Sequence, residues 1–143
     1  MTAPPLPRRA ALAACGLWAV GAVLAGATGV RSLTHSQGGY AAVYALVTAG
    51  LATLAVATYR AVRMAETVTL VLLGSQLLGT VGAAWELVRA DEGGAKARHL
   101  DDLGINFRLA VAANLIYSAT ASAVFVWAWR ERRRSRGAIS RRS

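Results

Sequence analysis

The sequence predicts an all-α integral membrane protein, a bundle of four transmembrane helices whose two ends both face the cytoplasm. Three observations favour this class. Hydrophobic residues make up 55% of the 143-residue chain, too large a share for an ordinary soluble domain of this size. Ionisable residues lie almost entirely between four long apolar runs or after the last run. Sixteen Lys and Arg against seven Asp and Glu give a net charge of +9, concentrated on alternate connections.

Each apolar run is long enough to cross a bilayer as a helix. At about 1.5 Å of rise per residue, twenty residues cover the roughly 30 Å hydrocarbon layer. A helix is required because lipid offers no partner to a free backbone N–H or C=O group. The predicted spans are residues 10–30, 40–59, 67–88 and 109–129. They form one domain over residues 1–129, and a basic tail, residues 130–143, follows and is expected to be flexible.

The placement of arginine predicts the orientation, because short connections rich in Arg and Lys stay in the cytoplasm. Eleven of the sixteen cations precede the first span, join the second to the third or follow the fourth. The other five share their connections with four carboxylates. Fifteen of the sixteen cations are Arg, and Ala, Gly and Val dominate the apolar positions, a composition typical of a high-GC bacterial genome. We therefore expect a multi-pass protein of a bacterial cytoplasmic membrane.

The first span also has features of a secretory signal. Arg8 and Arg9 precede its apolar run, and Ala25–Ala27 offers small residues for cleavage. We favour an uncleaved anchor, while cleavage, which would leave three spans, stays open. Cys15 follows small residues as in lipoprotein signals, but only five apolar residues separate it from Arg9. That run is too short for such a signal, so we interpret Cys15 as a packing residue.

Small and polar side chains recur every four residues along three of the spans. In lipid, such stripes allow helices to approach closely and to hydrogen-bond one another. We therefore expect them at helix contacts. The stripes are Ala41, Ala45, Ala49, Thr53 and Ala57 in the second span, Ser75, Gly79 and Ala83 in the third, and Ala110, Asn114, Ser118 and Ser122 in the fourth.

Two further polar residues lie within the third span. Gln76 is near its middle, where an unpaired carboxamide is costly, and its depth matches that of Ser118 and Thr48. We predict a shared polar contact among these residues. Glu86 lies within a turn of the outer boundary, where water and Arg89 can stabilise its charge, so we interpret it as a boundary anchor. A proton or ligand contact at Glu86 is the alternative.

The connection between the third and fourth spans predicts a short amphipathic helix from residue 95 to residue 103. Asp101 or Asp102 is expected to cap the fourth span. A sharper hypothesis combines Asp101 and Asp102 with His35, His99 and Glu86 in an outer metal or proton site. Their spacing matches no established zinc motif, so solvated loop charges are the simpler interpretation. We predict no cofactor.

A cluster of arginines follows the fourth span. A cationic segment directly after a span contacts anionic lipid and fixes orientation, so we expect lipid rather than nucleic acid as its partner. These residues are Arg130, Arg132, Arg133, Arg134 and Arg136.

The sequence contains no phosphate-binding loop, dinucleotide fingerprint or nucleophile elbow. We therefore interpret the chain as a non-enzymatic accessory or partner-binding membrane component, either homo-oligomeric or bound to another membrane protein. One alternative is a small carrier or channel with a polar path through Gln76, Asn114 and Glu86. Another is a membrane enzyme or metal-binding protein that uses the outer cluster of His99, Asp101 and Asp102.

Overall fold

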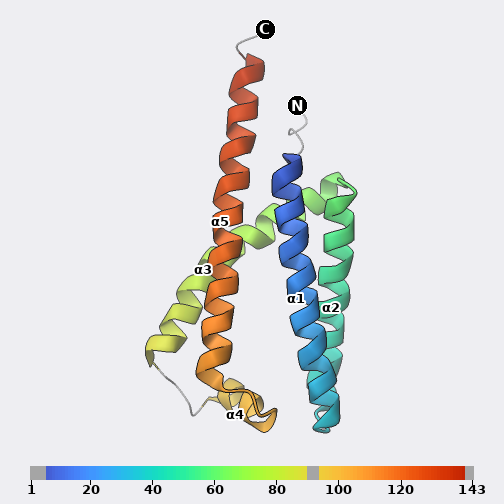
Figure 1. The fold of residues 1–143 in the computed structure, drawn as a ribbon, viewed down its shortest axis with the longest axis vertical. Helices are drawn as coiled ribbons and strands as arrows, with labels where there is room; N and C mark the ends of the chain where they lie inside the picture. Colours follow the sequence, from blue (N-terminus) through green and yellow to red (C-terminus); the bar gives the residue numbers. More distant parts are fainter. Residues whose placement is uncertain (1–5, 90–93, 141–143) are drawn as a thin grey trace.

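The computed structural model is all-α, as predicted, and describes residues 6–89 and 94–140, with the side chains of Ala95 and residues 135–140 excepted. In these residues four long apolar helices and one short helix follow one another along the chain (Figure 1). All four long helices are apolar and long enough to cross a membrane. The helices are α1 (Arg8–Thr34), α2 (Gly38–Tyr59), α3 (Arg63–Arg89), α4 (Ala95–Asp102) and α5 (Phe107–Ser140).

The long helices begin earlier or end later than the predicted spans, because hydropathy marks the apolar part of a helix and not its ends. Pro7, with its φ of −55°, lies at the N-cap of α1. The predicted flexible tail begins within α5, which continues as a helix to Ser140. The Arg134 guanidinium donates to the Glu131 carboxylate at 3.1 Å, a pair at i,i+3 that supports this extension. Residues 141–143 of the predicted tail lie outside the described residues.

Neither Asp101 nor Asp102 caps α5. The Asn106 side-chain oxygen instead accepts a hydrogen bond from the Leu109 backbone N–H at 3.1 Å, three residues further along the chain. Gly104, which has a φ of +64°, turns the chain between the end of α4 and this cap. Asp102 instead accepts a hydrogen bond from the Gln37 amide at 3.4 Å, and Asp101 lines a pocket beside Phe107 and Arg108.

The long helices pack as two pairs. Figure 1 shows α1 and α2 side by side, while α3 runs obliquely across α5. One end of the molecule holds the start of α1, the α2–α3 turn and the arginine-rich part of α5, and we call it the terminal end. The other end holds the α1–α2 turn and α4, and we call it the α4 end.

Glycines on α1 permit its close contact with α2. A Cβ added at Gly29 would lie 3.0 Å from the Tyr44 Cβ, and one added at Gly26 would lie 3.5 Å from the Thr48 methyl group. The face of α2 that meets α1 therefore carries Tyr44 and Thr48. Of the four-residue stripe predicted for the second span, Ala41 is buried at this contact, with its carbonyl oxygen 3.8 Å from a Cβ added at Gly29, whereas Ala45, Ala49 and Thr53 are exposed. Alanine abundance produced the stripe, while glycines on the partner helix decided the contact.

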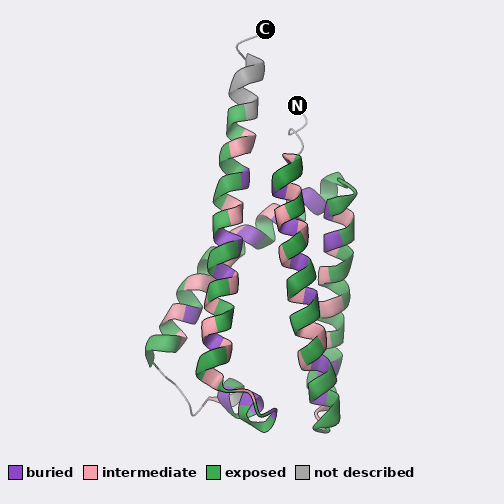
Figure 2. Ribbon diagram, in the orientation of Figure 1, coloured by how far each residue is buried: buried purple, intermediate pink, exposed green. Residues whose placement is uncertain are grey.

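Two small cores join the two pairs: Leu6, Ala10 and Ala128 form one, and the larger one surrounds Trp18. Trp18 of α1 packs with alanines from three helices and with Leu73 of α3, and all members are buried. Away from these cores the helices expose most of their surface: between 17 and 22% of each apolar stretch is buried within the chain (Figure 2). The bundle is consequently more open than a compact four-helix arrangement. The residues of the larger core are Ala14, Trp18, Ala55, Leu73 and Ala121.

Candidate functional site

The short helix α4 docks on the α1–α2 turn through aromatic stacking. The ring of His99 lies on the ring of Tyr40, with centroids 3.8 Å apart and an angle of 21° between their planes. The His99 Nε2 atom is 3.5 Å from the Tyr44 hydroxyl. The Gln37 amide donates to the Asp102 carboxylate at 3.4 Å. The amphipathic helix predicted here is thus confirmed, and it holds the α1–α2 pair to the start of α5.

Three buried polar atoms belong to this junction and have no hydrogen-bond partner within the described part of the chain. They are the Ser32 hydroxyl, the Gln37 side-chain oxygen and His99 Nδ1. An unsatisfied buried polar group costs roughly 1–3 kcal/mol. Apolar burial of Ala97, Leu100 and Leu103, together with the stacking of His99 on Tyr40, offsets this cost and attaches α4.

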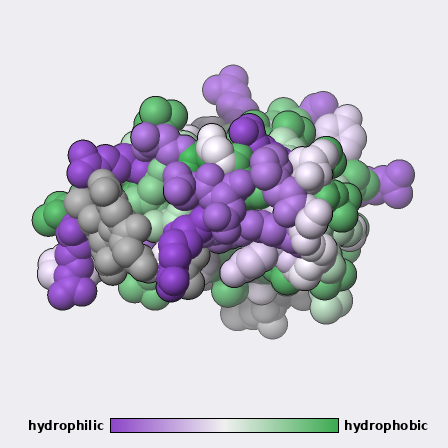
Figure 3. Space-filling view, turned by 90° about the horizontal axis from the view of Figure 1, so that it is seen from below, coloured by the Kyte–Doolittle hydropathy of each residue, from purple (hydrophilic) through white to green (hydrophobic). Residues whose placement is uncertain are grey.

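The predicted outer metal cluster is not assembled in the structure. His35 is bonded through Nδ1 to the Arg31 carbonyl at 3.0 Å, while His99 is stacked on Tyr40. Asp101 lines a separate pocket of about 460 Å³ between α4 and α5, beside Arg98 and Arg108. Among the residues that the structure describes, no three His, Cys, Asp or Glu side chains are close enough to share a metal ion. Figure 3 looks onto this end and shows mainly hydrophilic side chains across its centre.

Glu86 pairs with Lys96 and not with Arg89, the cation that the sequence suggested. Its carboxylate accepts a hydrogen bond from the Lys96 ammonium at 2.7 Å, and both side chains are well exposed, Lys96 by 55% and Glu86 by 40%. Arg89 instead lies over the ring of Trp85, 5.1 Å from its centroid. An ion pair with this exposure contributes little to stability. It links α3 to α4 at the edge of the apolar region.

Gln76 and Ser118 lie together at the contact between α3 and α5. The Ser118 hydroxyl donates to the Gln76 side-chain oxygen at 3.1 Å. Gly79 makes room for this bond, since a Cβ there would lie 3.3 Å from that oxygen and 3.4 Å from the hydroxyl. Ser122, one turn further along α5, lies 3.4 Å from the Thr80 hydroxyl. Thr48 takes no part in this contact, because its hydroxyl donates to the Tyr44 carbonyl within α2.

The other members of the predicted stripes separate into buried and exposed residues. Ala83 is buried. Ser75 is exposed and donates to the Leu72 carbonyl of its own helix at 2.7 Å, so it makes no contact with a second helix. Asn114 is also exposed, although Val111 and Ser118 on the same face of α5 are buried. The oblique path of α3 explains this difference, since α3 covers only part of that face.

A second polar cluster, near the terminal end, was missed by sequence reasoning. Glu66 is buried, 4% exposed, and its carboxylate accepts a hydrogen bond from the Leu6 backbone N–H at 3.3 Å. One turn along α3, the Thr69 hydroxyl accepts from the Trp18 indole at 3.3 Å and is 2.8 Å from the Thr58 hydroxyl. Glu66 falls just outside the predicted third span, residues 67–88, because α3 begins at Arg63, before the apolar run. The signal that could have found it is its spacing of three residues from Thr69, which places both on one face of a helix.

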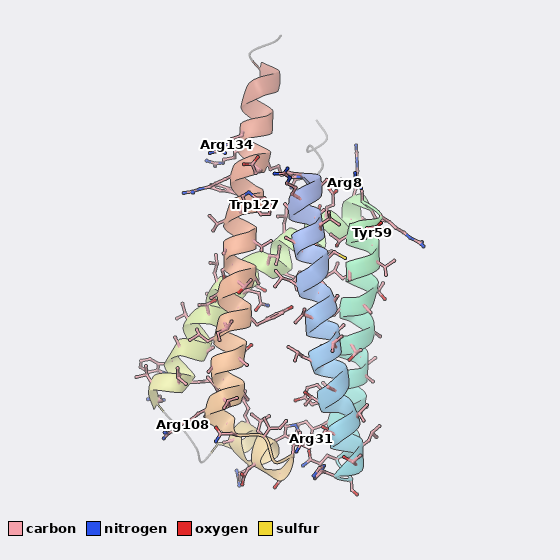
Figure 4. All side chains as sticks on the ribbon, viewed as in Figure 1. Arg8, Arg31, Tyr59, Arg108, Trp127 and Arg134 are labelled. Carbon is pink, nitrogen blue, oxygen red and sulfur yellow. The ribbon has the colours of Figure 1, made fainter. Side chains whose placement is uncertain are left out.

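Arginines and aromatic rings gather at the terminal end. The Arg133 guanidinium lies over the Trp129 ring, 4.0 Å from its centroid. Figure 4 shows Arg8 and Arg134 at this end and Arg31 and Arg108 at the opposite end. The side chain of Arg136, another predicted lipid contact, lies outside the described residues. Trp129 and Arg133 thus place an amphipathic ring beside a cation, as at a membrane boundary.

Comparison with known proteins assigns no function to these residues. No protein-family model, curated protein or solved structure matches the chain.

Proposed function

We propose that this chain is a non-enzymatic, partner-binding protein of a bacterial cytoplasmic membrane, which it crosses four times with both termini in the cytoplasm. Four long apolar helices with little internal burial support a membrane location, since water would be a poor solvent for their exposed surfaces. Lipid or the helices of another subunit would cover those surfaces.

The distribution of arginine supports the proposed orientation. The terminal end carries Arg8 and Arg134 together with Arg60 and Arg63 at the α2–α3 turn, so it gathers the cations of three separate segments. Cation-rich short connections remain on the cytoplasmic side of bacterial membranes. The terminal end is therefore assigned to the cytoplasm.

Asn114 carries the proposal that the chain binds a partner. Its carboxamide is exposed on α5, within the apolar stretch Phe107–Arg134, and has no hydrogen-bond partner in the described part of the chain. Leaving an amide unpaired in hydrocarbon is costly, and Asn side chains bond across transmembrane helix contacts. A carboxamide both donates and accepts. A second copy related by a twofold axis would present Asn114 to Asn114, so we infer a homodimer.

Association of the purified protein in detergent tests this proposal. Asn114→Leu should raise the dimer dissociation constant roughly three- to twentyfold, the equivalent of about 0.6–1.7 kcal/mol for a hydrogen bond between transmembrane helices. Thr120→Val is the matched control, because Thr120 is exposed on the same helix but donates to its own Ile116 carbonyl at 2.8 Å. Equal dissociation constants for the two variants would contradict the role of Asn114.

Native purification from the membrane provides the second arm of the test. If the wild-type chain is monomeric and no other membrane protein purifies with it, the proposed function is wrong. Solute flux through reconstituted vesicles that disappears in Gln76→Leu would replace it with the carrier or channel alternative.

A further inference from the structure

An apolar groove lies along α2, beside the first turns of α3. Its volume is about 700 Å³, and eight of its ten lining residues belong to α2, while Val68 and Leu72 belong to α3. A second groove of about 450 Å³ shares Thr53 and Ala57 with the first and continues to Arg60. The two grooves are therefore adjacent, and together we call them the α2–α3 groove. Six of its lining residues are Leu46, Ala49, Thr53, Ala57, Val68 and Leu72.

The length of the α2–α3 groove matches one leaflet of a bilayer. From Leu46 to Ala57 the helix advances roughly 16 Å, at about 1.5 Å per residue. The hydrocarbon layer is about 30 Å thick, so the acyl chains of one leaflet occupy about half of that depth. A single extended acyl chain would therefore fit along the groove.

The end of the groove is cationic. Arg60 lines it, and Arg63 follows at the start of α3; both side chains are exposed, and neither is paired with a carboxylate among the described residues. The nearest acidic residue along the chain, Glu66, is buried and bonded to the Leu6 N–H. A guanidinium group forms strong, charge-assisted hydrogen bonds to phosphate oxygens. The groove thus combines an apolar trough with a phosphate-binding group at its end.

We propose that the α2–α3 groove binds one anionic phospholipid, with an acyl chain between Leu46 and Ala57 and the phosphate against Arg60. A second copy of the chain fits this face less well. A twofold axis along the membrane normal would bring each Arg60 close to the Arg60 of the partner subunit, and these like charges repel. The anionic headgroup neutralises the same charge. This site is separate from Asn114, and it does not depend on the proposed dimer.

Native mass spectrometry of the full chain in detergent tests the site. Phosphatidylglycerol should bind more tightly than phosphatidylcholine with the same acyl chains. Arg60→Gln should weaken the first phosphatidylglycerol binding step roughly tenfold, the loss expected for one charge-assisted hydrogen bond. Thr53→Leu, which fills the groove at an exposed position, should weaken the binding of both lipids.

Arg8→Gln is the matched control, because it removes the same charge from the same end of the molecule but lies on α1. An equal loss in Arg60→Gln and Arg8→Gln would overturn the proposal, since binding would then follow net charge alone. Equal affinity for the two lipids would also overturn it. Dissociation of a dimer by Thr53→Leu would instead identify the groove as an interface between copies, whereas failure of the Asn114 test leaves these lipid measurements unaffected.

Discussion

The side chain of Tyr117 on α5 connects the two helix pairs by reaching α1 at Gly21, which has no side chain. Its hydroxyl donates to the Leu17 carbonyl of α1 at 3.0 Å. It reaches that carbonyl because a Cβ at Gly21 would lie only 2.7 Å from the hydroxyl oxygen and 3.2 Å from Leu51. At the residue scale, this contact between α1 and α5 therefore requires glycine at position 21.

Gly21→Ala should accordingly destabilise the protein by about 1–3 kcal/mol, as an overpacked contact does. Gly16→Ala, on the same helix, is the control, because a Cβ there meets nothing within 4 Å. It should be neutral or slightly stabilising, since Ala favours a helix more than Gly does. Reversible unfolding in mixed micelles titrated with SDS measures both. Adding Tyr117→Phe to Gly21→Ala should recover part of the loss, and equal stability of the two glycine variants would refute the contact.

The hydrogen bond between Ser118 and Gln76 provides a second test at this scale. Ser118→Ala should lower the free energy of unfolding by about 0.6–2 kcal/mol, because it removes the bond and leaves the Gln76 oxygen without its donor. Ser75→Ala should have almost no effect, since Ser75 is exposed and bonded to its own helix. The same SDS titration applies, and a larger effect of Ser75→Ala would show that α3 packs through its other face.

At the scale of elements, α4 is the least apolar helix and has the smallest anchorage. Its attachment rests on the buried side chains of Ala97, Leu100 and Leu103, on His99 against Tyr40, and on the long hydrogen bond from Gln37 to Asp102. The salt bridge from Lys96 to Glu86 is exposed and adds little. Opening of α4 would separate the α4 end of α1 and α2 from α5 without disturbing the core around Trp18.

Hydrogen–deuterium exchange should detect this opening. His99→Ala should accelerate exchange of the α4 amides roughly two- to tenfold, the effect of losing an aromatic pair of about 0.5–1.5 kcal/mol. Arg98→Ala shortens an exposed neighbour on the same helix and should leave the exchange rates unchanged. If both variants exchange at the wild-type rate, stacking on Tyr40 does not hold α4.

At the scale of the whole molecule, charge and apolar surface are segregated along one axis. Arginines of the terminal end lie at the ends of the apolar helices, and hydrophilic side chains cover much of the α4 end (Figure 3). The helices between them expose large apolar side chains on most sides. Such a molecule is oriented in a bilayer by its ends, while its flanks contact lipid or other subunits.

Single-cysteine labelling should reveal that orientation. In a Cys15→Ser background, Arg98→Cys at the α4 end should react with a membrane-impermeant maleimide on intact cells. Arg134→Cys at the terminal end should react only after the cells are made permeable, because the proposed cytoplasmic side is hidden from the reagent. Both positions are exposed in the structure, so burial does not limit the reaction. The reverse pattern would invert the proposed topology.

Sequence reasoning predicted well what depends on local composition and poorly what depends on a neighbouring helix. Apolar runs predicted the four long helices, and amphipathic spacing predicted α4. Asn114 was placed in a packing stripe and is exposed, while His99 was considered as a metal ligand and lies on Tyr40. Glu66 was overlooked because its burial depends on the residues before α1 and not on its own segment.

The sequence by itself determined that the chain is helical and apolar along four segments, because hydropathy and backbone hydrogen bonding within a helix are properties of each segment alone. Only the tertiary structure decided which faces meet. Gly21, Gly26 and Gly29 allow α1 to approach its neighbours, and the oblique path of α3 covers Ser118 but not Asn114. Helices that are apolar all round carry no stripe that marks one face for contact, so close packing of small side chains selects the face.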